Sequence, residues 1–308
     1  MKLGDAQWFL KTFVPPGEAE RKEAVGNTSG ISPNLQAAFD PTHASFSPIP
    51  TPGRSDWLAN ISETGQTFSQ YQRSRPNRPD QRRTTIYLQP LGAFPPDVAP
   101  SLSRLAEFAS VFFGMPVKQL PEESIQGLPI ESRPRAQGRQ ILTGDVLTWF
   151  KPRVPKDAYC LLAVTMTDLY PDPKWNFVFG QGSLKDRVGV YSFARYLPPD
   201  GGTNVSNSVE RLLLLRSCKV LAHETGHMFG IKHCVHYHCL MNGSNGLSET
   251  DAAPIHLCPV CLRKLHFAKP FDVEQRYRKL RTLSKQFGWE SEERWLRTRM
   301  SSLAPGGE

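Results

Sequence analysis

The feature that most constrains this chain is the string from His223 to His233, which reads H-E-x-x-H-x-x-G-x-x-H. Histidines four residues apart on a helix lie on one face, one turn apart, where a single zinc ion can bind both imidazoles. A glycine at position 230 can end that helix in a left-handed conformation and turn the chain back. The spacing therefore predicts His223, His227 and His233 as the ligands of one catalytic zinc ion.

Three protein ligands leave a fourth zinc position for water, whose pKa falls from 15.7 to about 7. Glu224, beside the first ligand, is predicted as the general base. A lone H-E-x-x-H also occurs by chance as a polar stripe on unrelated helices. Gly230, His233 and Met241 add independent requirements that a random helix has no reason to meet, so they favour the catalytic interpretation. We expect Met241 in a tight turn beneath the metal. The string thus predicts a zinc-dependent hydrolase of peptide bonds.

Four of the six cysteines are close together in the sequence, with C-x4-C and C-x2-C spacing: Cys234, Cys239, Cys258 and Cys261. This spacing is typical of a metal knuckle and predicts a second, structural zinc ion, so that the chain holds two. Two disulfides, or two pairs in different sites, are the alternatives. The loop between these cysteines has little core of its own, so that zinc binding would stabilise it.

Other histidines and cysteines receive simpler interpretations. His236, His238 and His256 lie near the four cysteines, but four thiolates already complete a tetrahedron, so we expect these histidines on the surface. Cys160 and Cys218 fall on apolar faces of a strand and a helix, where free cysteine acts as a small hydrophobe. We therefore expect both in the core.

Composition and charge limit the partners. The chain has 308 residues, 39% of them apolar, which is enough for a core. It has no apolar run long enough to cross a membrane and no signal peptide, so we expect the cytoplasm, with the nucleus as an alternative, and no secretion. The net charge of +8 comes from scattered Lys and Arg residues. We expect a peptide substrate, no nucleic acid, no membrane and a monomer.

The order of elements predicts an α/β protein. Strands are predicted over 85–88, 116–120, 158–165, 175–179 and 188–196, and helices near 5–13 and over 101–113, 140–150, 273–287 and 290–300. A long helix begins near Asn207 and carries the histidines. Alternating strands and helices favour a layered fold with a parallel sheet. A glycine-rich turn would join 175–179 to 188–196 as a hairpin at the sheet edge.

The histidine string, the interleaved cysteines and Met241 together resemble the archaemetzincin family, because ordinary metzincins lack this cysteine set. The resemblance extends to 168–171, 175–180 and 192–196, and more weakly to 55–57. It implies a metzincin-like zincin fold, with a twisted, mostly parallel sheet, an antiparallel edge strand, a backing helix and the zinc helix. It also implies aminopeptidase-like action on small peptides, with 175–179 as an edge strand that pairs with extended substrate.

The resemblance also suggests a division of the chain. Residues 1–83 form a loop-rich N-terminal segment, and 84–287 form the catalytic domain. Its upper subdomain covers 84–230, and its lower subdomain with the zinc knuckle covers 231–287. Residues 288–308 form a C-terminal helix and tail. The connection from 196 to 207 is shorter than in the family pattern, which affects the rim of the cleft.

Two other functions are compatible with parts of this sequence. A zinc-stabilised binding protein could keep this fold and cleave nothing, but the presence of Glu224 argues against it. Nucleic-acid binding through the cysteine knuckle is disfavoured because the residues between Cys239 and Cys258 include no Arg or Lys.

Overall fold

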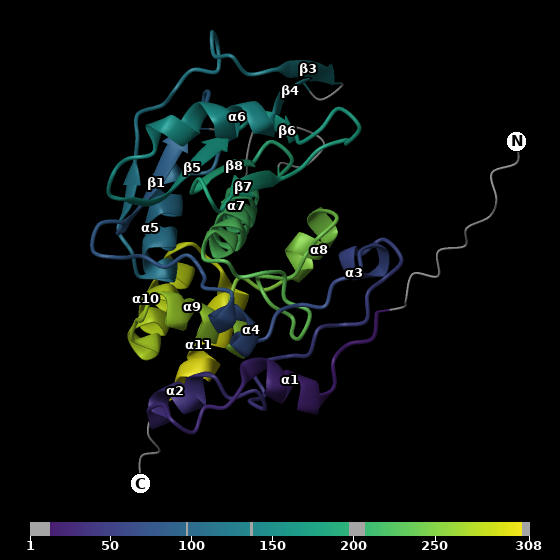
Figure 1. Ribbon diagram of the computed structural model, residues 1–308, viewed down its shortest axis with the longest axis vertical. Helices are drawn as coiled ribbons and strands as arrows, with labels where there is room; N and C mark the ends of the chain where they lie inside the picture. Colours follow the sequence, from purple (N-terminus) through teal and green to yellow (C-terminus); the bar gives the residue numbers. More distant parts are fainter. Residues whose placement is uncertain (1–12, 97, 136–137, 197–206, 304–308) are drawn as a thin grey trace, which may run out of the picture.

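The computed structural model describes residues 13–96, 98–135, 138–196 and 207–303, and its upper part is a five-stranded sheet (Figure 1). The strands are β1 (Thr85–Pro90), β2 (Val117–Gln119), β5 (Ala158–Thr165), β7 (Gly180–Ser183) and β8 (Val188–Ser192). Their order is β2-β1-β5-β8-β7, with four parallel strands and β7 antiparallel to β8 at one edge. The prediction of a mixed α/β fold with a mostly parallel sheet is confirmed.

Helices cover both faces of the central strand β5. Helices α5 (Leu102–Phe113) and α7 (Asn207–Met228) pack on one face, and α6 (Thr143–Phe150) packs on the other. Leu161 and Ala163 of β5 face α6, whereas Cys160, Leu162 and Val164 face α5 and α7. Alternate side chains of a strand point to opposite faces, so two covered faces require a continuous apolar run. The predicted β1-α5-β2 unit is also present.

The helix predicted over 140–150 is partly wrong. Residues up to Leu142 form β4 (Gly138–Leu142), and only the remainder is helical. β4 lies in a second, three-stranded sheet between β3 (Ser132–Arg135) and β6 (Asp168–Tyr170). Pairing with β6, which is distant in sequence, outweighs the local helical pattern.

The edge strand is also displaced from its predicted position. Residues 175–179 form no strand, apart from an isolated bridge at Val178, and the edge strand is β7, which directly follows them. The glycines expected in a turn lie within β7 and β8. A Cβ atom on Gly180 or Gly189 would overlap the side chain of Tyr191, which lies against both. These glycines therefore make room for a buried tyrosine.

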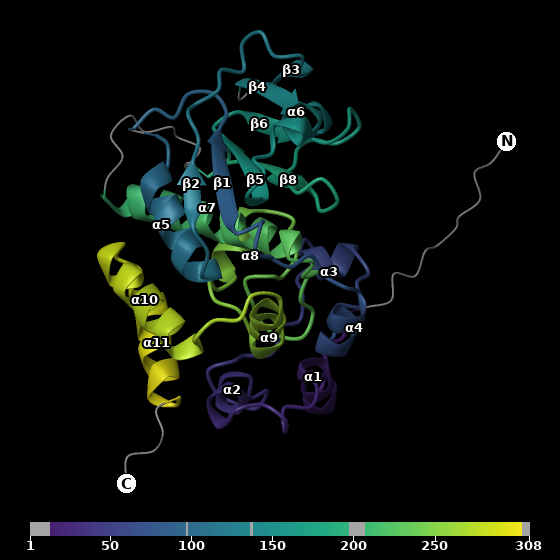
Figure 2. The same ribbon diagram turned by 60° about the vertical axis from the view of Figure 1, so that its left-hand side comes forward.

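The described part of the N-terminal segment, residues 13–83, contains four short helices joined by loops. They are α1 (Glu18–Val25), α2 (Pro33–Ala38), α3 (Trp57–Asn60) and α4 (Phe68–Arg73). Phe39 and Tyr71 are fully buried, and Arg263 of α9 (Pro259–Ala268) donates a hydrogen bond to Asn27 O at 2.7 Å. Figure 2 shows α1 and α2 beneath α9. The segment thus shares the core of the lower half, and the predicted domain boundaries remain a prediction.

The C-terminal helices agree with the prediction. α10 (Val273–Gln286) and α11 (Glu290–Ser301) pack against each other, and α10 also packs against α5. No described helix is both long enough and apolar enough to span a membrane. The helix predicted near residues 5–13 and the connection between Tyr196 and Asn207 involve residues outside the described ranges.

Two tyrosine hydroxyls donate hydrogen bonds to main-chain carbonyl groups at the carboxyl end of α7. Tyr71 of α4 donates to Phe229 O at 2.7 Å, and Tyr159 of β5 donates to Met228 O at 3.0 Å. The last carbonyl groups of a helix have no partner within the helix, so these bonds fix where α7 ends. One of the two donors comes from the N-terminal segment.

We expect Tyr71→Phe to lower the free energy of unfolding by about 1–3 kcal/mol, because it leaves a buried carbonyl without its donor. Denaturant unfolding of the zinc-loaded protein measures this. The matched control is Tyr191→Phe, because the Tyr191 hydroxyl is buried and has no hydrogen-bond partner among the described residues. The control should not lose stability, and equal stability of the two variants would contradict the assignment.

Candidate active site

The helix α7 presents His223 and His227 one turn apart and then stops. Gly230 has φ +77°, its N–H bonds to His227 O at 2.8 Å, and the N–H of Ile231 bonds to Gly226 O at 3.2 Å. This pair of bonds is a Schellman motif, which glycine in the left-handed conformation permits. The chain turns back as predicted and brings His233 to the other two rings.

The three imidazoles converge, and their candidate ligand atoms all lie within 4.8 Å of one another. His223 Nδ1 lies 2.8 Å from Leu240 O, and His227 Nδ1 lies 2.7 Å from Ile231 O. A carbonyl oxygen only accepts, so each Nδ1 carries the proton and each Nε2 is left with a lone pair. The two Nε2 atoms lie 3.0 Å apart. Two acceptors facing each other fit a cation held between them, as in zinc sites.

Burial supports the neutral form of these rings. It lowers the pKa of His227 to about 4 and that of His223 well below its usual value, with the neighbouring imidazoles adding to the effect. Neutral imidazole is the form that binds a metal. The histidine cluster therefore fits zinc in its protonation state as well as in its geometry.

Glu63 orients the third histidine, and sequence reasoning missed it. His233 Nδ1 lies 2.8 Å from Glu63 Oε1. Burial is the largest single influence and raises the pKa of Glu63, but the hydrogen bond and charge of His233, with smaller contributions from Trp57 and His227, together outweigh it, so the net shift is downward. The Trp57 ring meets the His233 ring edge-on, with centroids 5.3 Å apart. Glu63 is about 170 residues upstream, and no local pattern links it to the histidines.

Met241 lies directly against the metal-binding helix. It is fully buried, and a Cβ atom on Gly226 would come within 2.6 Å of its sulfur. The carbonyl of Met241 also accepts a bond from Cys234 N at 2.7 Å. The predicted turn is thus present beneath the histidines, and glycine at position 226 gives it room.

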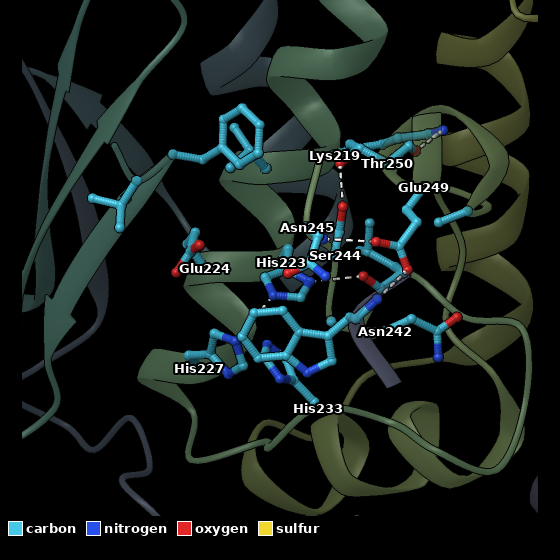
Figure 3. A pocket seen from close by; sticks show the side chains of 18 of the residues that line it. Lys219, His223, Glu224, His227, His233, Asn242, Ser244, Asn245, Glu249 and Thr250 are labelled. Atoms are coloured by element: carbon cyan, nitrogen blue, oxygen red, sulfur yellow. Dashed lines mark hydrogen bonds between the residues drawn. The ribbon is translucent and has the colours of Figure 1, made fainter. Parts of the chain in front are cut away.

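A cavity of about 390 Å³ opens at the three histidines, and Glu224 also lines it (Figure 3). Burial raises the pKa of Glu224 to about 7. One wall comes from the chain before β7 and the other from the chain around α8 (Leu247–Ala252). The lining also includes Trp57, Trp175, Phe177, Val178, Phe179, Tyr196, Lys219, Val220, Asn242, Ser244, Asn245, Glu249 and Thr250.

Two arginines contact the chain that contributes Trp175, Phe177 and Phe179 to one wall of the cavity, which we call the aromatic wall. Arg195 forms two hydrogen bonds with the Asp168 carboxylate, at 2.9 and 2.7 Å, and its guanidinium lies 3.7 Å from the centre of the Phe177 ring. Arg133 donates to Trp175 O at 2.6 Å. These contacts join the separate segments around 168–171, 175–180 and 192–196 into one surface.

The four cysteines form one fully buried cluster without a disulfide. Cys234 Sγ and Cys258 Sγ lie 3.6 Å apart, and the N–H groups of Cys258 and Met241 donate to Cys239 Sγ at 3.3 and 3.5 Å. Hydrogen bonds from the other thiols, that of Cys239 first, lower the pKa of Cys234. The arrangement fits a tetrahedral thiolate site better than two disulfides or two separate sites.

The nearby histidines differ from their prediction as surface residues. His236 is buried, and His238 and His256 are partly buried. The His256 ring stacks on Trp295 with centroids 3.5 Å apart, and its Nδ1 lies 2.9 Å from a Glu292 oxygen. Packing against α11 accounts for the burial of His256. Cys160 and Cys218 are fully buried, as predicted.

Comparisons with known proteins agree with this geometry. The sequence profile of Peptidase family M54 matches residues 155–267. Archaemetzincin-2 of Rattus norvegicus is 37% identical over 275 residues, which cover 80% of this chain and 77% of that protein. The chain belongs to the archaemetzincin family. Archaemetzincin-1 of Homo sapiens is 32% identical over 277 residues, covering 80% of this chain and 56% of that protein.

Archaemetzincins are zinc metallopeptidases, so the predicted enzyme class is confirmed. Two solved archaemetzincins are similar to this chain. That from Archaeoglobus fulgidus, complexed with malonate, is 28% identical over 58% of this chain and 99% of its own, with a TM-score of 0.46. That from Methanopyrus kandleri is 28% identical over 62% of this chain and 97% of its own, with a TM-score of 0.47.

We expect Glu63→Gln to weaken zinc binding at the histidine cluster by about 10- to 100-fold, as loss of an outer carboxylate does elsewhere. Zinc competition with a chelator measures the affinity. The control is Glu249→Gln, because Glu249 lines the same cavity but bonds to the main-chain N–H groups of Trp57 and Asn245. Unchanged zinc affinity in Glu63→Gln would show that His233 needs no carboxylate.

We expect Cys258→Ser to reduce the zinc content from two ions per chain to one and to lower stability, because a closed thiolate site contributes directly to folding. Metal analysis of the purified protein gives the count. Cys218→Ser is the control, because Cys218 is an equally buried cysteine of α7 outside the cluster. A count that remains at two would overturn the structural site.

Proposed function

We propose that this archaemetzincin hydrolyses peptide bonds at the histidine cluster, with Glu224 as the general base. His223, His227 and His233 hold the catalytic zinc ion. The observation that carries the proposal is the convergence of three imidazoles beside a carboxylate in one cavity, with the Nδ1 atoms of His223 and His227 bound to carbonyl oxygens. The four cysteines hold a second zinc ion, whose site is closed and structural.

His223, His227 and His233 would hold a zinc ion that, when bound, would polarise the scissile carbonyl as a Lewis acid and lower the pKa of water. Glu224 accepts a proton from the attacking water and returns it to the leaving amine. Its buried carboxylate has a pKa of about 7, which suits transfer in both directions at neutral pH. Phe177 and Phe179 form one apolar side of the cavity.

The finer description of the fold is part of the same proposal. A metzincin-like arrangement puts the cavity between an upper subdomain with the sheet and a lower one with the cysteine cluster. The sheet above α7 and the loops below it support this division (Figure 1). The outer side of β7 has no neighbouring strand in the described sheet, so its main-chain groups are available to an extended peptide.

Aminopeptidase-like action on small peptides remains a prediction. An aminopeptidase needs an acceptor for the substrate amine. Both oxygens of Glu249 already accept hydrogen bonds from main-chain N–H groups, at 2.9 and 2.7 Å. The other carboxylate in the cavity lining is Glu224, which is therefore the remaining candidate acceptor. The catalytically silent binding protein is the disfavoured alternative, because Glu224 is a half-buried carboxylate beside the ligands, and removing a charge from water costs free energy.

We expect Glu224→Ala to lower peptide cleavage by on the order of a hundredfold or more, as loss of a general base does. Glu224→Gln keeps the size of the side chain and should lose activity to a similar extent. Cleavage of a fluorogenic peptide library by zinc-loaded protein measures the rate, and metal analysis should still find zinc in both variants. Cleavage at the unsubstituted rate would overturn the role of Glu224.

A further inference from the structure

Trp175 is a large apolar side chain at the active-site cavity that the mechanism does not use. Its exposed fraction is 59%, and among the described residues it is the one aromatic side chain of the four large apolar residues that are exposed. It also lines the cavity that contains His223 and Glu224. Single exposed apolar residues are common on protein surfaces. Trp175 differs from them in its position at the cavity and in the way its main chain is held.

Arg133 of β3 fixes the chain on both sides of Trp175. Its guanidinium donates to Pro173 O at 2.9 Å, to Trp175 O at 2.6 Å and to Asn176 O at 3.2 Å. The same group lies 4.0 Å from the centre of the Tyr170 ring. A guanidinium has five N–H donors in a planar fork. It can therefore hold three carbonyl groups of one short segment at once, although residues 173–177 form no helix or strand.

Gln140 of β4 supports the same segment from inside the protein and is fully buried. Its amide nitrogen donates to Asn176 O at 2.9 Å and to Asp168 Oδ2 at 2.6 Å. Its amide oxygen accepts from Nε of Arg133 at 2.8 Å and from Nε of Arg135 at 3.1 Å. Both donors and both acceptor sites of the amide are thus used. Because a buried amide is stable only when it is hydrogen-bonded, this network favours one position of Arg133 and of the segment.

The surface next to Trp175 is apolar and continues into the cavity. Phe177, Val178 and Phe179 line the cavity, and the rings of Phe177 and Phe179 meet edge-on with centroids 5.3 Å apart. A segment that is already fixed loses little conformational entropy when a ligand binds to it. Covering an exposed indole also removes apolar surface from water, which is favourable. An apolar group of a bound peptide would provide this cover.

We propose that Trp175 determines specificity by binding a large apolar side chain of the peptide substrate, and that Arg133, held by Gln140, positions it. An aromatic side chain suits best, because rings in offset-stacked or edge-to-face contact gain more than the area they bury. This inference rests on the proposed peptidase function, and it specifies the substrate class. Arg133 and Gln140 are not part of the cavity lining, so they act through the position of the segment.

Docking of another protein, or of a second copy of this chain, on the exposed indole makes a different prediction. Replacement of Trp175 would then change association, but the preference among short peptides would stay the same. The preference would also stay the same if the side chain had no binding role. The ratio between peptides with and without a large apolar residue therefore separates the proposal from both alternatives.

The first test measures peptide binding to zinc-loaded Glu224→Gln protein, so that it does not depend on turnover. The probes are acetylated, amidated pentapeptides of alanine with Phe at each position in turn. We expect at least one of them to bind about three- to tenfold more tightly than the all-alanine peptide. Adding Trp175→Ala should remove most of this ratio. Adding Leu184→Ala should keep it, because Leu184 is also exposed, at 46%, but lies outside the cavity lining.

The second test concerns the positioning residue and uses the active enzyme. Arg133→Met should raise KM for the preferred Phe peptide by about three- to tenfold. It should leave kcat and the zinc content unchanged, because His223 and Glu224 on α7 are not in contact with Arg133. The matched control is Arg139→Met, because Arg139 belongs to the same hairpin but its side chain forms no hydrogen bond or ion pair within the described residues.

Equal binding of all peptides, or a ratio that survives Trp175→Ala, would overturn the inference. A lower kcat together with loss of zinc in Arg133→Met would overturn the positioning role of Arg133. Failure of the unsubstituted enzyme to cleave any peptide would instead overturn the proposed function, and the binding ratio would still test the role of Trp175.

Discussion

The histidine cluster depends on three hydrogen bonds made by the Nδ1 atoms of its rings. Their partners come from three places: Leu240 after the turn-back, Ile231 at the helix end, and Glu63 in the N-terminal segment. These bonds fix the tautomers of His223 and His227 and aim their free Nε2 atoms at one point. Without them, the imidazoles could rotate apart, and a coordination site would not be formed in advance.

The cysteine cluster supports the same geometry from below. Cys234 directly follows the third histidine, and its N–H bonds to the carbonyl of Met241, which packs against Gly226 of the helix. From Cys234 to Cys258, the chain contains no helix or multi-residue strand except the short helix α8. Binding of one ion by the four buried thiols would compensate for the conformational entropy that this chain loses when it becomes ordered. The two clusters are therefore structurally coupled.

The N-terminal segment has a larger role than its composition suggests. Tyr71 caps the carboxyl end of α7, Glu63 orients His233, and Trp57 lines the cavity. These contacts cross from a loop-rich region to the end of the metal-binding helix. The segment is therefore part of the site, although its sequence has no periodicity from which this could be inferred.

The sequence by itself determined the two clusters, the helix that carries the histidines and the buried strand β5. Each of these follows from local spacing, such as the four residues between His223 and His227 or the apolar run of β5. Only the tertiary structure decided the position of the edge strand, the strand character of residues 140–142, and the hydrogen bond between Glu63 and His233. The physical reason is that these features depend on partners distant in sequence: Tyr191 against Gly180, β6 beside β4, and a carboxylate about 170 residues from its histidine.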